Sequence, residues 1–534
     1  MKKLCLAGFV SWLLVFWSLS VSGSDLTTIN KDFLIKPHEA YQWHLIKDSF
    51  GPTFSGGPAW RLYLAFLESK LKEYGVQDIQ HNKWTYNRWF TTEWPDDSNW
   101  SLAVEGQRVR VAQYGAYSGS TPPEGITAPL VFFNPLQPPA DIKGKIVVFA
   151  TLPHPKPPHD KKYLEWFTLN DHEYISSPET FPPLFTAVPP SESVAYDIWW
   201  QIRQHLKVSE IVKKGGAAGG VIVFNASYDR VAGLYTFPLY PTFPWPLGVP
   251  ILFLDRKAGA EVVEKAKAGQ TANLKLLAKV EPTETYQLIG YLPGKNYGTP
   301  ADEKILLATH TDGPAISQDN GGLGVLAVVA YFSRVPQAQR PRTLMIYLDN
   351  RHYMPTMEPG FTKEDWFTRN PETRKAIVGV IGLEHLGQVE TREDGDVFEP
   401  TGKVEPSFLW ARNNQTLIDM AIKAVKDHDL PRCMVQCVER AGKKGQMQGV
   451  WYGLGEAGLK ALGREIGEKT PAFATMGVQG AYWATTARID KFDKNHFVKQ
   501  IAVMSQLTGE LMAADLEKIR PVFAPGPGET QLFR

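Results

Sequence analysis

Apolar residues in the second half of the chain are gathered into short and nearly continuous runs. Three of these runs read "ILLATH", "LMIYLD" and "AIVGVIGL", and they begin at residues 305, 344 and 376. Runs of this length without alternating polar positions predict central strands of a sheet that is covered on both faces. Helical patterns separate them, including a strongly apolar segment after Gly321. The alternation predicts an α/β fold in which helices flank a mixed central sheet.

The stretch from residue 103 to residue 285 has a different pattern. Short β-rich runs such as "GKIVVFA", "GGVIVFN" and "VPILFLD" are broken by Pro and Gly, and a helical pattern follows the last one. A proline-rich stretch between residues 152 and 190 predicts a long surface excursion. We therefore predict an inserted β-rich domain at 103–285, with 25–102 and 286–534 forming the α/β domain.

The N-terminal residues 1–24 place two lysines before an apolar stretch that ends in small residues. This order predicts a secretory signal peptide that is cleaved near residue 23 or 24. We expect a secreted or extracytoplasmic protein, periplasmic in a bacterium, without stable membrane insertion after cleavage. A retained anchor is the alternative, because the apolar stretch approaches the ~20 residues that span a bilayer.

Cleavage of the signal peptide would leave Cys433 and Cys437 as the cysteines of the mature chain. Their spacing suits one local bridge or two buried thiols equally well. Charged side chains nearly balance, since 57 basic and 56 acidic residues give a formal net charge of +1. No global field favours nucleic acid, so we expect no nucleic-acid partner.

The apolar runs end in ionisable side chains. His310 and Asp312 follow the first run, Asp319 lies a short loop further on, and Glu384 and His385 follow the third. Ligands of open α/β sheets bind outside the carboxyl ends of the strands. A histidine beside carboxylates is the composition of a zinc site. The pattern predicts one metal site where these strand ends meet, completed by Glu384 or His385.

The motif "HTDG…QDNGG", which begins at residue 310, resembles the first metal motif of the secreted zinc aminopeptidases and glutamate carboxypeptidases. The resemblance covers almost the whole mature chain. It implies a zinc-exopeptidase-like domain that carries an inserted protease-associated domain. It also implies that His310 binds zinc, that Asp312 orients His310, that Asp319 bridges two metals and that Glu384 is a later ligand.

The second strand end departs from the family pattern. The family usually has two glutamates there, a general base and a ligand of the second zinc, where this chain has Arg351 and His352. The family's last histidine ligand falls on Trp483 or Ala484. A guanidinium stays protonated and cannot act as a base. It also repels a +2 ion ~5 Å away by roughly 6 kcal/mol at an effective dielectric constant of ~20.

These departures lead us to expect one zinc ion rather than two. The ion would lie between His310, Asp319 and Glu384, with His385 or His352 as a further ligand. Histidine can replace glutamate as a zinc ligand, which keeps His352 a candidate.

Arg351 would supply the positive charge that the second zinc supplies in the family. It could pair with Asp319, hold a substrate carboxylate or stabilise an oxyanion. A structural salt bridge is the alternative. His352 is the leading candidate for the group that accepts a proton from the attacking water, and Glu358 is the second.

The sequence therefore predicts a secreted metal-dependent hydrolase that acts on peptide or amide bonds. The alternative is a catalytically inactive relative that serves as a binding protein, which the missing base and last histidine favour. Carbohydrate binding is a third possibility, and only the 16 tryptophans support it.

Overall fold

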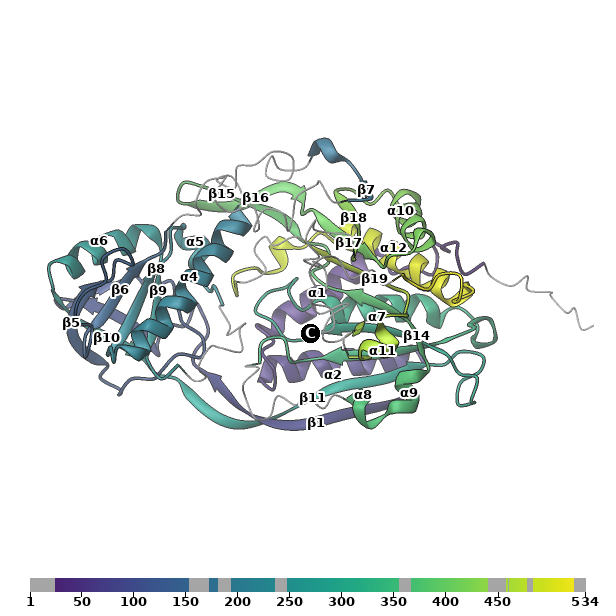
Figure 1. Ribbon diagram of the computed structural model, residues 1–534, viewed down its shortest axis with the longest axis horizontal. Coiled ribbons are helices and arrows are strands. Elements are labelled where there is room, and N and C mark those ends of the chain that lie inside the picture. Colours follow the sequence, from purple (N-terminus) through teal and green to yellow (C-terminus); the bar gives the residue numbers. More distant parts are fainter. Residues whose placement is uncertain are drawn as a thin grey trace, which may run out of the picture.

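The computed structural model describes residues 25–152, 172–180, 194–235, 247–354, 366–439, 458–459, 461–477 and 484–522. Figure 1 shows two lobes that are joined by the long strands β1 (Gln77–Phe90) and β11 (Lys279–Leu292). These strands pair in antiparallel register from Gln77 opposite Tyr291 to Phe90 opposite Lys279. The chain thus leaves the larger lobe on one strand and returns on its neighbour.

The larger lobe is built on a nine-stranded mixed sheet with the order β1-β11-β13-β12-β14-β19-β17-β18-β7. Its centre is parallel, and consists of β12 (Lys304–His310), β13 (Thr343–Asp349), β14 (Ile377–Leu383) and β19 (Ala472–Gly477). The outer strands are β17 (Ser407–Ala411), β18 (Cys433–Cys437) and β7 (Tyr174–Ile175). The predicted mixed α/β architecture is confirmed.

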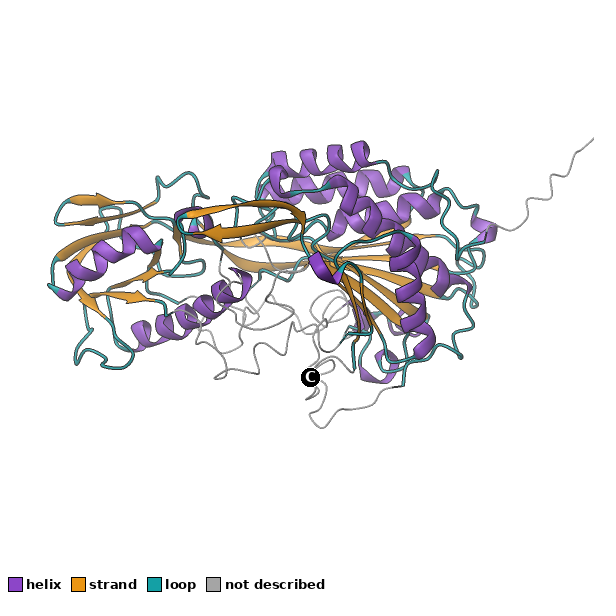
Figure 2. Ribbon diagram, turned by 90° about the horizontal axis from the view of Figure 1, so that it is seen from above, coloured by secondary structure: helices purple, strands orange, loops and turns teal. Residues whose placement is uncertain are grey.

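Helices cover this sheet, as Figure 2 shows. They include α1 (Pro37–Phe50), α2 (Pro58–Glu73), α7 (Gly321–Ser333), α10 (Gln415–Asp427) and α12 (Lys494–Ala513). The short helices α8 (Trp366–Arg369), α9 (Pro371–Lys375) and α11 (Arg464–Gly467) complete the lobe. Every residue of β13 is buried, because separate apolar clusters pack on its two faces. The apolar runs are therefore central strands, as predicted.

The helix α7 begins with two glycines because its N-terminus lies against two strand ends. A Cβ atom on Gly321 would lie 2.0 Å from the hydroxyl of Thr309 and 2.2 Å from the carbonyl oxygen of Leu383. On Gly322 it would lie 2.7 Å from the hydroxyl of Tyr63. This close approach holds the loop before α7 at the carboxyl ends of β12 and β14.

The smaller lobe contains an eight-stranded sheet with the order β3-β2-β10-β5-β6-β8-β9-β4. Its strands are β2 (Trp100–Val104), β3 (Gln107–Val109), β4 (Gln113–Tyr114), β5 (Ile126–Phe132), β6 (Ile146–Ala150), β8 (Gly219–Val223), β9 (Ile251–Leu254) and β10 (Thr271–Leu276). Its helices are α4 (Val194–Lys214), α5 (Tyr228–Val231) and α6 (Arg256–Lys267). The predicted domain boundaries at residues 103 and 285 fall within β2 and β11.

Part of the predicted proline-rich excursion has a structural role. Its described residues include β7, which pairs with β18 in the larger lobe. Tyr174 and Ile175 are partly exposed and form the edge strand of the nine-stranded sheet, so this part of the stretch lies at the surface of the larger lobe. The remainder of that prediction, like the signal peptide at 1–24, lies outside the described residues.

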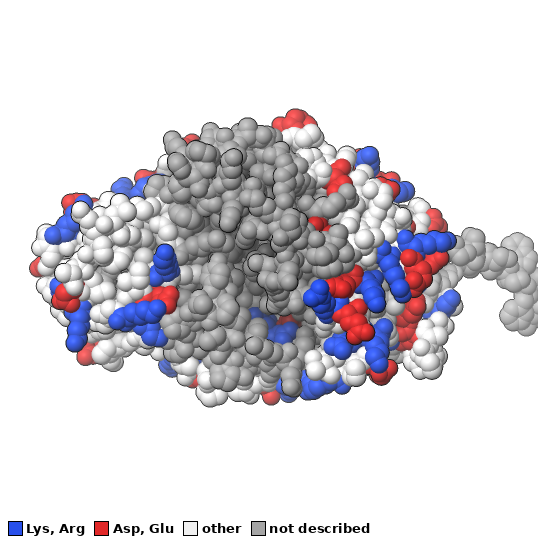
Figure 3. All heavy atoms as spheres, viewed as in Figure 1, with Lys and Arg blue, Asp and Glu red and all other residues white. Residues whose placement is uncertain are grey.

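Cys433 and Cys437 are buried thiols at the two ends of β18 and form no disulfide with each other. The two cysteines are four positions apart in an extended strand, so their Cα atoms are about 13 Å apart, well beyond the reach of a disulfide. Of the two alternatives, the structure therefore shows buried thiols. Within the described chain, no helix has the length and apolar character needed to span a membrane. Basic and acidic side chains are interspersed over the described surface in Figure 3.

Replacing Gly321 by alanine tests the packing at the start of α7. We expect Gly321→Ala to lower the free energy of unfolding by about 1–3 kcal/mol, because the added methyl group meets backbone and side-chain atoms. The control is Gly395→Asn, since Gly395 has a φ of 57° with open space around its Cβ position, and asparagine tolerates this conformation. Chemical denaturation of both variants measures the difference. An unchanged midpoint for Gly321→Ala would contradict the close packing.

Candidate metal centre

The strand register brings the predicted residues to one edge of the sheet. His310 ends β12 and lies opposite Asp349, which ends β13. On the other side of β12, Ala308 lies opposite Gly382 of β14. Two residues further along both strands, His310 therefore lies beside Glu384. Parallel pairing thus places residues from distant parts of the chain at one site.

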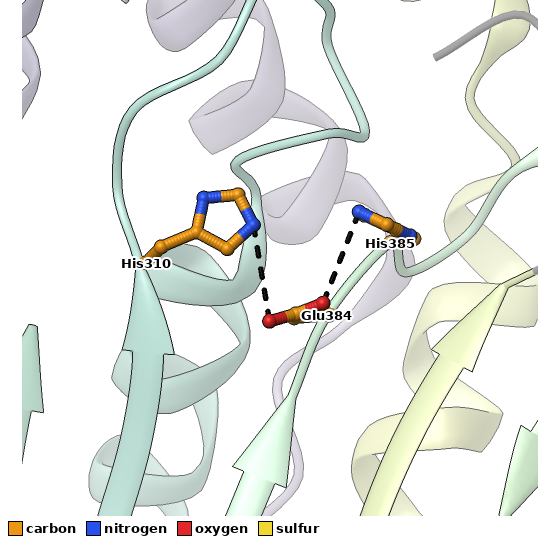
Figure 4. A group of neighbouring side chains, drawn as sticks. All are labelled: His310, Glu384 and His385. Carbon is orange, nitrogen blue, oxygen red and sulfur yellow. Dashed lines mark ion pairs between the residues drawn. The ribbon is translucent and has the colours of Figure 1, made fainter. Parts of the chain in front are cut away.

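Three buried side chains form a potential ligand group, which we call the metal-site cluster. It consists of His310, Glu384 and His385, whose ligand atoms all lie within 4.8 Å of one another. Nε2 of His310 is 3.8 Å from Oε1 of Glu384, and Nε2 of His385 is 4.0 Å from Oε2. Figure 4 shows both imidazole rings directed toward the carboxylate.

The ring of His310 is oriented by the main chain. Its Nδ1 lies 2.9 Å from the carbonyl oxygen of Asp312 and donates a hydrogen bond to it, which leaves Nε2 as the nitrogen that faces Glu384. Burial lowers the pKa of His310 to about 4 and that of His385 to about 3. Both rings are therefore neutral near pH 7, the form that binds a metal ion.

His385 lies in a tight turn after β14. Its φ is 49°, an uncommon value for a residue other than glycine. The turn is held by Asn320, whose side chain accepts a hydrogen bond from the backbone nitrogen of Leu386 at 3.0 Å and donates one to its carbonyl oxygen at 2.7 Å. The loop before α7 thus fixes the backbone that directs His385 toward Glu384.

The metal-site cluster fits a zinc ion. Ligand atoms each ~2.1 Å from a tetrahedral ion lie about 3.4 Å apart, so the observed spacings of 3.8 and 4.0 Å between the imidazole nitrogens and the carboxylate oxygens need only a small contraction. Two imidazoles and a carboxylate are typical of catalytic zinc sites, which keep the fourth position open. Among the described residues, no other group of three such side chains is close enough to hold an ion. Asp319 and His352 are not members of the cluster.

Asp312 is buried and organises the chain after β13. Its carboxylate accepts hydrogen bonds from the backbone nitrogens of His352 at 3.3 Å and Tyr353 at 2.6 Å, and from the hydroxyl of Ser55 at 3.2 Å. Burial raises its pKa to about 8. Asp312 therefore holds His310 through its own carbonyl group and the segment at 352–353 through its carboxylate.

Arg351 makes an ion pair with Asp349, two residues earlier. Its Nε and Nη2 atoms donate to the carboxylate at 2.6 to 3.1 Å. Gln287 and the backbone nitrogen of Asn350 also donate to Asp349. Burial, which raises the pKa of a carboxyl group, is outweighed by Arg351, and the pKa of Asp349 is lowered. The guanidinium charge is thus largely neutralised next to the strand end.

Asp319 has a different basic partner, which the sequence did not indicate. Nζ of Lys47, from α1, lies 2.5 Å from Oδ1 of Asp319, and both side chains are buried. Burial raises the pKa of Asp319 to about 7 although Lys47 opposes this shift. One feature of the sequence could have indicated that Lys47 is buried, because Lys47 lies on the same stripe of α1 as Ala40, Trp43 and His44.

His352 lies against the metal-site cluster. Its ring centroid is 4.3 Å from that of His310 and 4.7 Å from that of Tyr353. Burial, together with His310 and His385, holds the pKa of His352 well below its usual range, so the ring is neutral. The second candidate base, Glu358, lies outside the described residues.

The smaller lobe reaches the site through aromatic side chains. Tyr117 donates a hydrogen bond from its hydroxyl to the carbonyl oxygen of Tyr353. The ring of Tyr235 lies 5.7 Å from that of Tyr353 and stacks on Phe54 at 4.0 Å between centroids. These rings belong to one apolar cluster that includes residues of both lobes. The site therefore lies at the boundary between the lobes.

The segment that the sequence analysis matched with the family's last histidine ligand contacts the smaller lobe. Ala484 is buried and forms a backbone bridge with Leu234 of the smaller lobe. The backbone nitrogen of Thr485 donates to the carbonyl oxygen of Gly233 at 2.9 Å. An alanine offers no metal ligand in its side chain, and Trp483 lies outside the described residues.

Replacing Arg351 tests its pairing with Asp349. We expect Arg351→Met to lower the free energy of unfolding by about 3–5 kcal/mol near pH 7, because Asp349 loses the partner of a buried charge. In the unchanged protein the lowered pKa of Asp349 gives stability that is present above about pH 3.8 and lost as the pH falls through the folded-state value. The difference between the proteins should therefore shrink on acidification. Denaturation at several pH values measures it.

Two further variants complete this experiment. Arg351→Met/Asp349→Asn should regain most of the lost stability, since both charges of this pair are removed. Lys375→Met is the control, because the ion pair of Lys375 with Glu372 is exposed and is worth at most about 1 kcal/mol. A loss in Arg351→Met no larger than in the control would contradict the buried pair.

Comparisons with known proteins show the fold. No family model matches the chain, and no curated protein matches its sequence. A peptidase M28 precursor from Shewanella amazonensis SB2B is similar in structure, with a TM-score of 0.57 and 14% identity over 91% of this chain and 97% of the other. A zinc aminopeptidase from Bacillus subtilis has a TM-score of 0.53 and 13% sequence identity, over 91% of this chain and 98% of the other.

An aminopeptidase from Aneurinibacillus sp. strain AM-1 gives a TM-score of 0.50 with 12% identity, over 93% of this chain and 96% of the other. These alignments extend over both lobes, because they cover nine-tenths of the chain or more. At such low identity the similarity shows a shared backbone fold and does not show shared site residues. The chain therefore has the fold of the zinc aminopeptidases and M28 peptidases.

Proposed function

We propose that this chain is a secreted zinc-dependent hydrolase of peptide or amide bonds that holds one zinc ion. The observation that carries the proposal is the metal-site cluster, where His310, Glu384 and His385 converge within 4.8 Å at the carboxyl edge of the sheet. The structural neighbours named as zinc aminopeptidases support the metal and the class of substrate. Zinc bound there would supply a Lewis acid that polarises the scissile carbonyl group.

The chain's own groups can provide the proton transfer that hydrolysis needs. His352 is neutral and its ring lies 4.3 Å from that of His310, so a ring nitrogen of His352 is our candidate to accept the proton of the attacking water. Asp312 positions His352 through its backbone nitrogen. The carboxylate of Glu358, outside the described residues, remains the second candidate.

Arg351 is best assigned a positioning role in this scheme. The bidentate contact with Asp349 holds its guanidinium at the end of β13. The charge of the pair is close to zero, so the pair does not supply the full positive charge of an ion. Arg351 would then act on the reaction by fixing the backbone that leads into His352.

We propose that the aromatic side chains of the smaller lobe form an apolar wall beside the metal-site cluster. Tyr117 and Tyr235 reach the site at Tyr353. We propose that this lobe is a protease-associated domain that limits the size of the substrate. Recognition of a peptide segment with apolar side chains follows from this wall.

Zinc content and hydrolysis test the proposal together. The purified mature protein should contain one zinc ion per chain after loosely bound ions are removed, measured by elemental mass spectrometry. It should hydrolyse some members of a panel of aminoacyl and N-acylaminoacyl anilides and short peptides. His310→Ala should lose the zinc and lower kcat/KM at least ~100-fold, because a ligand of the ion is removed.

The control is His38→Ala, since His38 is exposed on α1 and away from the metal-site cluster. It should keep both the zinc and the activity. A chelator should abolish hydrolysis, and added zinc should restore it. A folded protein that contains no zinc and hydrolyses none of the panel would overturn the proposal and favour the non-catalytic binding protein.

A further inference from the structure

The turn that carries His385 has a backbone conformation that needs support. His385 has a φ of 49° and Gly387 a φ of 65°. At positive φ the Cβ atom of a side chain lies close to a carbonyl oxygen, so this conformation costs free energy at His385. The amide of Asn320 supplies part of the support, through its two hydrogen bonds to Leu386. The groups that hold Asn320 therefore influence the direction of the His385 ring.

Asn320 is held by a buried histidine of α1, His44. Nε2 of His44 lies 3.1 Å from Nδ2 of Asn320, and Nδ1 of His44 lies 2.7 Å from the carbonyl oxygen of Ala40. A carbonyl oxygen can only accept, so Nδ1 carries the ring proton and donates it to Ala40. Burial lowers the pKa of His44 to about 3, so the ring is neutral near pH 7 and Nε2 accepts from Asn320. The Asn320 amide thus has a partner for its oxygen and for both of its N–H groups.

The ring of His44 also contacts a second support of the turn, at the start of α12. It stacks on Phe492 with 3.6 Å between ring centroids and meets Phe497 edge-on at 4.8 Å. The turn packs against the same two residues, since a Cβ atom on Gly387 would lie 2.6 Å from the ring of Phe492 and 2.9 Å from Cβ of Phe497. The backbone nitrogen of Asp493 donates to the carbonyl oxygen of Gly387 at 2.7 Å. His44 therefore joins α1, the loop before α7 and the start of α12 around this turn.

We propose that His44 is a positioning residue of the metal centre, which holds the turn at 385–387 through Asn320 and so sets the affinity of the metal-site cluster for zinc. The inference rests on the proposed function, since it concerns the ligand His385 of the same centre. Without Nε2 of His44, a buried N–H group of Asn320 loses its acceptor, and the hydrogen bonds to Leu386 weaken. Zinc then binds a turn that is correctly formed for only part of the time, which lowers the apparent affinity by that fraction.

Zinc affinity tests this inference. His44→Phe keeps a ring against Phe492 and removes the acceptor, whereas His44→Gln retains an acceptor oxygen on its side chain. The control is His205→Phe, because His205 is also buried and has an aromatic edge contact, with Phe253 at 4.8 Å, but belongs to α4 of the smaller lobe. The Kd for Zn²⁺ is measured by competition with a chromophoric chelator.

The Kd should rise about 10-fold in His44→Phe, as for other groups that orient metal ligands. It should stay close to the value of the unchanged protein in His44→Gln and in His205→Phe. An unchanged Kd in His44→Phe, an equal rise in the control or a failure of His44→Gln to recover the affinity would each overturn the inference.

Hydrogen exchange gives a second readout that needs no metal. The backbone N–H group of Leu386 donates to Oδ1 of Asn320, so its protection reports the state of the turn. In the metal-free proteins, mass spectrometry of peptides that span 384–388 should show exchange at least ~10-fold faster in His44→Phe, because an unpartnered buried N–H group destabilises the turn. Exchange in His205→Phe should match the unchanged protein. Equal exchange in His44→Phe and the control would contradict the positioning role.

Circular dichroism checks that the variants fold. Should His44→Phe not fold, His44→Leu, whose side chain is smaller, replaces it in both measurements. Failure of both to fold would overturn the inference, because His44 would then be needed for the whole fold rather than for the turn.

The inference and the proposed function can fail separately. Absence of zinc from the unchanged protein would refute the proposed function. Exchange at Leu386 in the metal-free proteins would still decide whether His44 holds the turn.

Discussion

The parallel pairing of β12 with β13 and β14 is the constraint on which the site depends. It aligns His310 with Asp349 on one side and brings it beside Glu384 on the other. The loop before α7 then fixes the following turn, because Asn320 bonds both backbone groups of Leu386. A shift of one residue in this register would separate the groups, since side chains alternate between the faces of a sheet.

Charge compensation follows from that arrangement. The strand ends collect several carboxylates in a buried region, and each of those at Asp349, Asp312 and Asp319 has its own donor: Arg351, backbone nitrogens and Lys47. The buried charges at the strand ends are therefore compensated by groups of the chain itself.

The sequence predicted the central strands and the convergence of their ends, because apolar runs that end in ionisable residues report both burial and the edge of the sheet. It did not predict the partners of the charges. Arg351 pairs with Asp349, only two residues away, whereas Asp319 was the partner that the sequence offered. Lys47 lies more than 250 residues before Asp319, and only its place on the buried stripe of α1 indicated a buried charge. The ion-pair partner of a buried charge is set by tertiary packing, which a local sequence pattern does not report.

A segment after β19 contacts the smaller lobe through its backbone. Ala484 forms a backbone bridge with Leu234, and the backbone nitrogen of Thr485 donates to Gly233, so this segment joins the two lobes. The same packing carries Tyr117 and Tyr235 to Tyr353. The two sets of contacts thus join the smaller lobe to the segments that follow β13 and β19, at the edge of the sheet that carries the metal-site cluster.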